Sequence, residues 1–142
     1  MDHFVSFDLF EEAPDGVLVS DTTGRVRLCN RAAGALLDCD PRAALRRPCW
    51  EVARLWTREG KRFCGRNCRV RREAARGRLQ PRRILMRHFR NRPPLEIELF
   101  SFLVPTRGER TWGLLHLLAP SPRRNPKRQP RLPSNSATRR AP

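Results

Sequence analysis

Apolar residues recur at every second position in three segments of the C-terminal half of the chain. These segments are residues 83–90, 95–104 and 111–118. A period of two is typical of a β-strand that buries one face. The connections at 91–94 and 105–108 are short and contain Pro or Gly, and connections of that length join antiparallel neighbours. The pattern therefore predicts a three-stranded antiparallel meander.

The middle segment of this meander is apolar on both sides near its end. Alternate side chains of a strand point to opposite faces, so Leu99 and Leu103 share one face while Phe100 and Phe102 share the other. A strand with two apolar faces is expected to be covered on both. We expect the cover to come from an N-terminal helix carrying Phe4, Phe7 and Phe10, from a partner subunit, or from both.

Two shorter apolar segments near the N-terminus, 16–20 and 25–29, are separated by Asp21-Thr22-Thr23-Gly24. Asp at the start of a turn bonds the backbone ahead of it, and Gly supplies the positive φ at the end of the turn. Asn30 follows directly, and its side-chain oxygen can cap the next helix. The pattern predicts a strand, a turn, a second strand and a capped helix over 31–37.

The remaining helices are predicted to be short. A three-residue aromatic spacing indicates an amphipathic helix at 4–12, which Pro14 ends. Asp40 and Pro41 suit the cap and first position of a helix at 41–46. Helical turns are also predicted at 50–55 and at 68–76, and the charged, Gly-containing stretch between them is predicted to be an exposed loop.

Composition divides the chain into three parts. The formal charge of +16 is concentrated in residues 54–92, which carry +13, and in residues 120–142, which carry +7. The last part has six prolines and no acid, and its composition is that of segments that cannot bury enough surface to fold. We therefore expect an N-terminal amphipathic helix at 1–12, one domain at 13–119 and a disordered basic tail at 120–142.

Composition also limits the cellular context. No run of apolar residues is long enough for a transmembrane helix, and the acidic start of the chain differs from a secretory signal. The five cysteines are an odd number, which argues against a disulfide framework and for reduced thiols. We expect a cytoplasmic protein that does not associate with a membrane.

The stretch APDGVLVSDTTGRVRLCNRAAGALL (13–37) resembles the opening of PAS sensory domains, in which a strand pair with a D-x-x-G turn precedes an Asn and a small-residue helix. DPRAALRRPCWEV (40–52) is similar to the segment that follows, and the order of elements continues the likeness to about residue 118. The resemblance implies an α+β fold, with a five-stranded antiparallel sheet in the order 2-1-5-4-3 and short helices over one face. It also implies a sensory or interaction module that binds a small ligand or a protein partner in bacterial signalling or transcription regulation.

Three of the cysteines follow a C-x14-C-x3-C spacing: Cys49, Cys64 and Cys68. Thiolates are soft ligands for zinc or an iron–sulfur cluster, although four ligands are usual, and Cys39 and His88 are candidates for the fourth. The alternatives are free thiols, with Cys49 buried as a small hydrophobe, and a redox switch. We expect the nearby arginines to lower the pKa of Cys64 or Cys68. The set also resembles that of bacterial PAS domains usually linked to a helix-turn-helix output.

A cavity for an apolar small molecule is the other candidate site, and the same residues could instead close into solid core. Its expected lining is Leu36, Leu37, Val52, Leu55, Leu85, Leu99 and Leu115. GRNCR at 65–69 is similar to the photoactive-cysteine motif of light-oxygen-voltage flavin domains, but residues 95–104 and 111–118 have no Asn or Gln to hold a flavin. Haem has only the strand histidines His88 and His116 as candidate ligands. No cofactor is obligatory, and flavin and haem are both disfavoured.

The residues show no catalytic arrangement, because neither the acids nor the three histidines stand in a motif with a nucleophile. We therefore expect a non-enzymatic sensor that acts as a homodimer or with a signalling partner, through the sheet face and the N-terminal helix. The alternatives are a Cys-based metal or redox sensor and a charge-driven nucleic-acid-binding protein. The latter would use segment 54–92 and the tail to bind phosphates in a salt-dependent manner.

Overall fold

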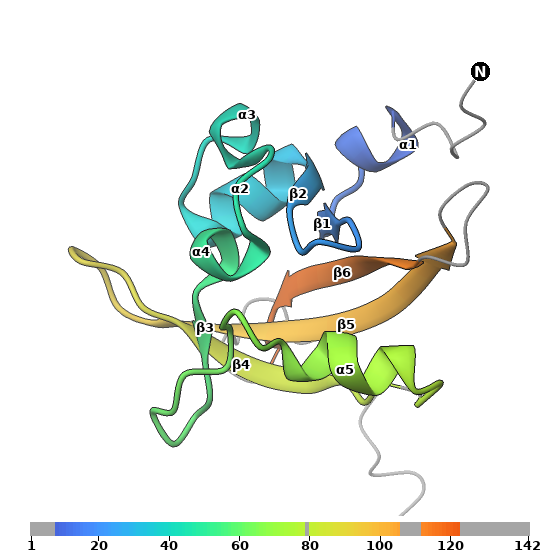
Figure 1. Cartoon of the computed structure of the whole chain (residues 1–142). Helices are drawn as coiled ribbons and strands as arrows, with labels where there is room; N and C mark the ends of the chain where they lie inside the picture. Colours follow the sequence, from blue (N-terminus) through green and yellow to red (C-terminus); the bar gives the residue numbers. More distant parts are fainter. Residues whose placement is uncertain (1–7, 79, 106–111, 123–142) are drawn as a thin grey trace, which may run out of the picture.

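A curved antiparallel sheet with short helices on its concave face forms the body of the protein (Figure 1). The computed structural model describes residues 8–78, 80–105 and 112–122. Its strands are β1 (Gly16–Ser20), β2 (Val26–Cys29), β3 (Leu55–Trp56), β4 (Arg83–Arg87), β5 (Leu95–Pro105) and β6 (Trp112–Pro120). The expected α+β class is confirmed.

The strand order is β2-β1-β6-β5-β4-β3, and each pair of neighbours is antiparallel. Without β3 this is the expected order 2-1-5-4-3, including the meander of β4, β5 and β6. The expected count of five strands was wrong by one, because residues 50–55 were predicted as a helical turn. Leu55 instead pairs with Arg87 of β4, and a two-residue strand of this kind exists only through its partner.

The predicted N-terminal unit is confirmed in detail. The backbone N–H groups of Thr23 and Arg25 donate to Oδ1 of Asp21 at 2.9 and 3.1 Å, and Gly24 has a φ of 85°. Helix α2 (Arg31–Leu37) starts at Asn30, whose side-chain oxygen accepts from the Ala33 N–H. The turn, the cap and the helix therefore lie where the local signals in the sequence predict them.

The other helices are short, and they lie where the sequence predicts helices but are shorter than predicted. They are α1 (Asp8–Glu11), α3 (Pro41–Ala44), α4 (Cys49–Ala53) and α5 (Arg69–Ala75). Asp40 caps α3 through the Arg42 N–H, as expected. Gly34 allows the chain after α2 to turn back closely, because a Cβ there would lie 2.8 Å from both the Cys39 carbonyl oxygen and Cγ of Pro41.

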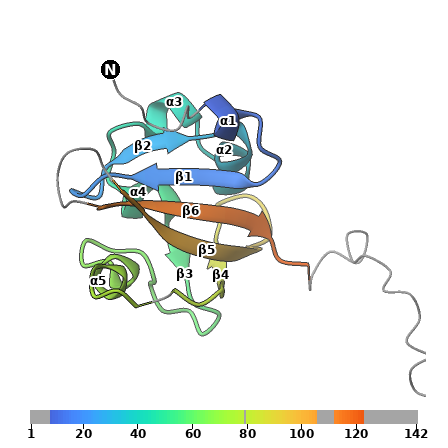
Figure 2. The same ribbon diagram turned by 90° about the vertical axis from the view of Figure 1, so that its right-hand side faces the viewer.

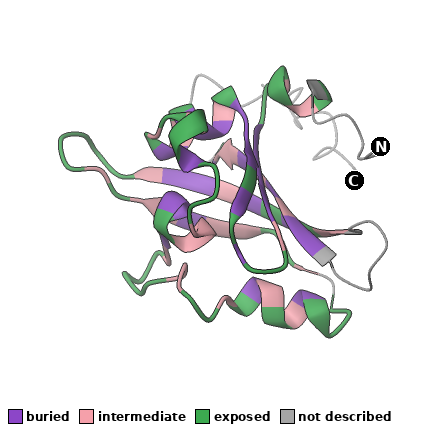
Figure 3. Ribbon diagram, turned by 45° about the horizontal axis from the view of Figure 1, so that its top comes forward, coloured by how far each residue is buried: buried purple, intermediate pink, exposed green. Residues whose placement is uncertain are grey.

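The two faces of the sheet have different covers. The inner face carries the main core, where strand residues such as Leu18, Ile97 and Leu118 pack with Leu37 and Val52 of the helices. Figures 2 and 3 show these helices gathered over the sheet and the buried positions concentrated on the strands. The main core and the candidate cavity therefore belong to this inner face.

On the outer face, α1 covers only part of the sheet. Phe10 packs against a cluster formed by Val17, Val19 and Leu28. Phe100 and Phe102 of β5 remain 37% and 50% exposed. The expected cover of this face by an aromatic helix is thus seen for Phe10, whereas Phe4 and Phe7 lie outside the described residues, as does most of the expected tail.

Candidate functional site

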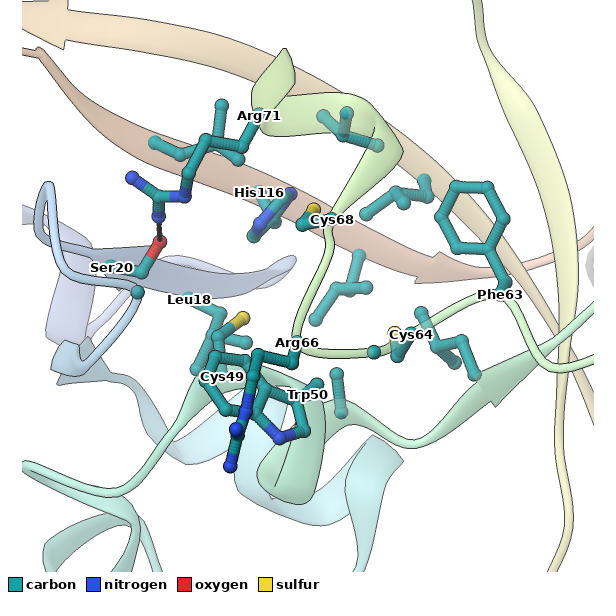
Figure 4. Close-up of a pocket in the computed structure, with 18 of the residues that line it drawn as sticks. Leu18, Ser20, Cys49, Trp50, Phe63, Cys64, Arg66, Cys68, Arg71 and His116 are labelled. Carbon is teal, nitrogen blue, oxygen red and sulfur yellow. Dashed lines mark hydrogen bonds between the residues drawn. The ribbon is translucent and has the colours of Figure 1, made fainter.

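A cavity of about 300 Å³ lies between the inner face of the sheet and the chain from α4 to α5 (Figure 4). This volume is at the lower end of the range of small-molecule sites, about 300–1,000 Å³. Most of its wall is apolar. The apolar lining residues are Leu18, Trp50, Ala53, Leu55, Phe63, Val70, Leu99, Leu114 and Leu118.

Three parts of the chain form the walls. Strands β1, β5 and β6 form the floor, because their inward side chains alternate with outward ones. Helix α4 brings Cys49 and Trp50 to one side of the cavity. The Trp50 ring packs against the turn at residues 21–24, where a Cβ on Gly24 would lie 3.2 Å from the ring. Residues 63–68 and α5 close the other side, held by the Phe63 N–H bonding the Leu55 carbonyl at 3.0 Å.

One end of the cavity is polar. Arg71 extends from α5 and donates from Nη2 to Oγ of Ser20 on β1 at 2.8 Å (Figure 4). His116 of β6 lies beside them, and its Nδ1 is 2.8 Å from Oγ of Ser101 on β5. Ser20 and His116 are both buried. Polar side chains from β1, α5 and β6 therefore meet at this end, and Ser101 of β5 holds the His116 ring from outside the lining.

The electrostatics of this end are positive. Burial, followed by the charge of Arg71, lowers the pKa of His116 to about 4, so the ring is neutral near pH 7. The described lining of the cavity includes two arginines, Arg66 and Arg71, and no carboxylate. The geometry suits an acceptor or an anion better than a cation.

The three cysteines of the C-x14-C-x3-C spacing all line this cavity. Burial raises the pKa of Cys49, and it raises the pKa of Cys64 to about 11. The expectation that nearby arginines would lower the pKa of Cys64 was wrong, because loss of hydration opposes the thiolate more than Arg62 and Arg87 favour it. Cys64 is therefore a thiol rather than a thiolate at neutral pH.

No preformed metal centre is seen in the part of the chain that the structure describes. Within it, no group of three or more His, Cys, Asp or Glu side chains is placed to hold a metal ion. All five cysteines are unpaired thiols. Metal binding by Cys49, Cys64 and Cys68 stays a prediction, and it would require these side chains to move together.

The other residues predicted for an apolar site are divided among three places. Leu55 and Leu99 line the cavity. Leu37, Val52 and Leu85 are buried in the main core with Leu36 packed against it, so they support the cavity from behind. Leu115 lies on the outer face with Val17 and Val19, because its position in β6 alternates with the inward His116.

Sequence reasoning did not predict the polar end. Ser20 ends a predicted strand and Arg71 is one of fifteen basic residues in the segment 54–92, so neither stands out. His116 could have been placed inward from the period-two pattern, since it alternates with Leu115 and Leu117. His88, which the sequence placed on a strand, instead follows the end of β4 at Arg87; it is exposed and its ring lies edge-on to Trp56.

Comparison with known proteins agrees with the fold. Residues 7–73 match the PAS domain family. None of the curated proteins matches the sequence closely enough to count as a relative. Across the ranges that the structure describes, no helix combines the length and the hydropathy that a membrane span requires.

Solved structures extend the likeness beyond residue 73. The PAS domain of an HTR-like protein from Haloarcula marismortui is 20% identical with a TM-score of 0.56, covering 80% of this chain and 86% of that one. A photoactive yellow protein domain from the sensor histidine kinase Ppr of Rhodospirillum centenum is 16% identical with a TM-score of 0.58, covering 81% and 93%. A PAS domain from Desulfitobacterium hafniense is 14% identical with a TM-score of 0.59, covering 80% and 99%. At these identities the likeness shows a shared fold.

Proposed function

We propose that this chain, which has the PAS fold and matches the PAS domain family over residues 7–73, senses a small molecule bound in the cavity beside α5. The cavity is the observation that carries the proposal. Its floor is the sheet and its walls are α4, residues 63–68 and α5, so an occupant would contact elements far apart in sequence. A ligand that binds only the folded protein raises its free energy of unfolding by mass action.

The proposed output is a change in how α4 and α5 pack on the sheet. Trp50 of α4 and Val70 of α5 both line the cavity, so filling it would order both helices relative to β5 and β6. PAS domains are in general sensory modules rather than enzymes. A role in bacterial signalling or transcription regulation fits this arrangement and is part of the proposal.

Indole is a suitable neutral probe because it is small, aromatic and apolar. We expect it to bind the wild-type protein and to raise the midpoint of thermal unfolding. Ala53→Leu should abolish this increase, because Ala53 is buried and lines the cavity, so the larger side chain takes up the space. The measurements are calorimetric titration and thermal unfolding with and without indole.

Ala35→Leu is the matched control, since Ala35 is exposed on α2 and away from the cavity. This variant should bind indole as the wild type does. Equal indole binding by Ala53→Leu and Ala35→Leu would contradict a ligand site at this cavity.

PAS domains commonly mediate protein–protein contacts, and we propose that a second copy of this chain covers the outer sheet face. Phe100 and Phe102 support this proposal, since they lie on β5 beyond the part of the face that Phe10 covers. An exposed apolar patch on a sheet is typical of an interaction surface.

In light-scattering measurements coupled to size exclusion, Phe102→Glu is expected to weaken the dimer by about tenfold or more, because it places a charge in an apolar contact. Leu45→Glu changes an apolar side chain that is 42% exposed elsewhere, and it should leave the dimer intact. A wild-type protein that stays monomeric at high concentration would overturn this part of the proposal.

A charge-driven nucleic-acid binder is less well supported. Several arginines of the segment 54–92 bind carboxylates of the protein itself, among them Arg58 to Glu96 at 2.9 Å and Arg83 to Glu73 at 3.3 Å. Part of the charge that made this segment conspicuous is therefore used within the fold. The PAS assignment explains the arrangement of elements, which charge alone does not.

A further inference from the structure

Arg71 is a partly buried cation at the wall of a cavity, and it has no carboxylate partner among the described residues. Its one described hydrogen bond goes to the neutral hydroxyl of Ser20. Some arginines of the same region are paired with carboxylates, since Arg69 and Arg83 both bind Glu73, and Arg82 binds Glu98. A guanidinium removed from water without a counter-charge favours binding of an anion.

The neighbours of Arg71 can donate to the same anion. Ser20 accepts from Arg71 through its oxygen, which leaves its own hydroxyl proton free to donate. His116 uses Nδ1 for Ser101, which leaves Nε2 as the ring nitrogen for the cavity. When the Ser101 hydroxyl donates to Nδ1, the neutral His116 ring carries its proton on Nε2. The Nε2–H group is then a third donor at the polar end of the cavity.

The rest of the cavity defines the body of the ligand. Leu18, Leu99 and Leu118 line the cavity from the sheet, and Trp50 and Phe63 line it from α4 and from residues 63–68. Figure 4 labels Leu18, Trp50 and Phe63 around the cavity. The described lining contains no carboxylate, so nothing there would attract a positively charged group on the ligand. An apolar or aromatic body fits these walls, and a multiply charged ion would lose its hydration without compensation.

We infer that the ligand of this cavity is a small organic monocarboxylate, with its carboxylate at Arg71, Ser20 and His116 and its apolar body between Trp50 and Phe63. This inference rests on the proposed ligand-sensing function and specifies the chemical class. The planar guanidinium suits the planar carboxylate, since two parallel N–H bonds can form between them. A protein sensing such an acid would respond to the anion that predominates near neutral pH.

Phenylacetate and phenylacetamide are matched probes, because they share the aromatic body and differ in the charged end. We expect calorimetric titration of the wild-type chain at pH 7 to give about 10- to 100-fold tighter binding of phenylacetate, as charge-assisted hydrogen bonds contribute more than neutral ones. Arg71→Met keeps an unbranched apolar side chain and removes the charge, and it should bring the two affinities within about threefold of each other. Inorganic phosphate, which has no apolar body, should not compete.

Arg72→Met is the control variant, since Arg72 is the next residue of α5 and is exposed. It should keep the preference of the wild type for phenylacetate. Equal affinities of the two probes in the wild type, or an unchanged preference in Arg71→Met, would overturn the inference. If indole still binds and Ala53→Leu still blocks it, the ligand-sensing function stands without the acid. Failure of indole and both phenyl probes would count against the function and the inference together.

Discussion

Replacing Asn30 by Ala is expected to lower the free energy of unfolding by about 2–4 kcal/mol, although the change removes only a few atoms. The side chain is 2% exposed and makes four hydrogen bonds. Oδ1 accepts from the backbone N–H of Val17 at 2.8 Å and of Ala33 at 2.9 Å. Nδ2 donates to the carbonyls of Phe10 and Asp15 at 2.7 and 2.9 Å.

Asn30 thereby joins α1, β1 and α2 at one point. Alanine would remove the helix cap, which contributes about 1 kcal/mol, and would leave the buried Val17 N–H without its acceptor. An unpaired buried polar group costs about 1–3 kcal/mol. The loss of stability expected for Asn30→Ala is therefore larger than the loss expected when an exposed helix cap is removed.

The measurement is urea unfolding followed by tryptophan fluorescence. Asp40→Ala is the control, because Asp40 also caps a helix, through the Arg42 N–H at 3.1 Å, but is exposed. It should cost about 1 kcal/mol. Similar losses for Asn30→Ala and Asp40→Ala would show that the buried bonds of Asn30 contribute little.

The second large effect is a loss of stability at mildly acidic pH caused by His116. Its pKa is lowered from 6.5 to about 4 by burial and then by Arg71. Between these two values the unfolded chain binds a proton that the folded chain does not, so the free energy of unfolding falls as pH falls. Each tenfold difference in proton affinity between the folded and unfolded chains corresponds to about 1.4 kcal/mol. The shift of the His116 pKa therefore lowers the free energy of unfolding by about 3 kcal/mol below pH 4, and it has no effect above about pH 7.

Between pH 7 and pH 5 we expect the ligand-free protein to lose about 2 kcal/mol of stability, measured by urea unfolding. His116→Gln has no group to titrate at this site and should lose less than about 0.5 kcal/mol over the same interval. Carboxyl groups titrate mainly below pH 5, so they disturb this window little. Parallel pH profiles of the two proteins would refute the assignment of the acid sensitivity to His116.

Local signals account for the elements that were predicted well. The Asp21–Gly24 turn, the Asn30 cap and the Asp40-Pro41 helix start depend on side chains bonding to backbone within four residues, so their sequence is sufficient to specify them. The inward and outward sides of β5 follow from a period of two. Leu99 is buried and Phe100 is exposed, as that period requires.

Elements and sites that depend on a distant partner were not predicted. Strand β3 has two residues and needs β4 beside it. The outward position of Leu115 follows from the alternation in β6, yet the residue was assigned to a cavity because it is apolar. The polar end of the cavity joins Ser20 to Arg71 across 51 residues, and no spacing in the chain indicates that pair.

The sequence by itself determined the order of the helices and of every strand except β3, the turn and caps that start them, and the PAS resemblance, because these arise from neighbouring residues and from the periods of strand and helix. Only the tertiary structure decided that Arg66 and Arg71, of fifteen basic residues in one segment, line the cavity, and which thiols are shielded from water by burial. Burial and unpaired charge depend on what packs around a side chain, and that environment exists only once the sheet and helices have closed over it.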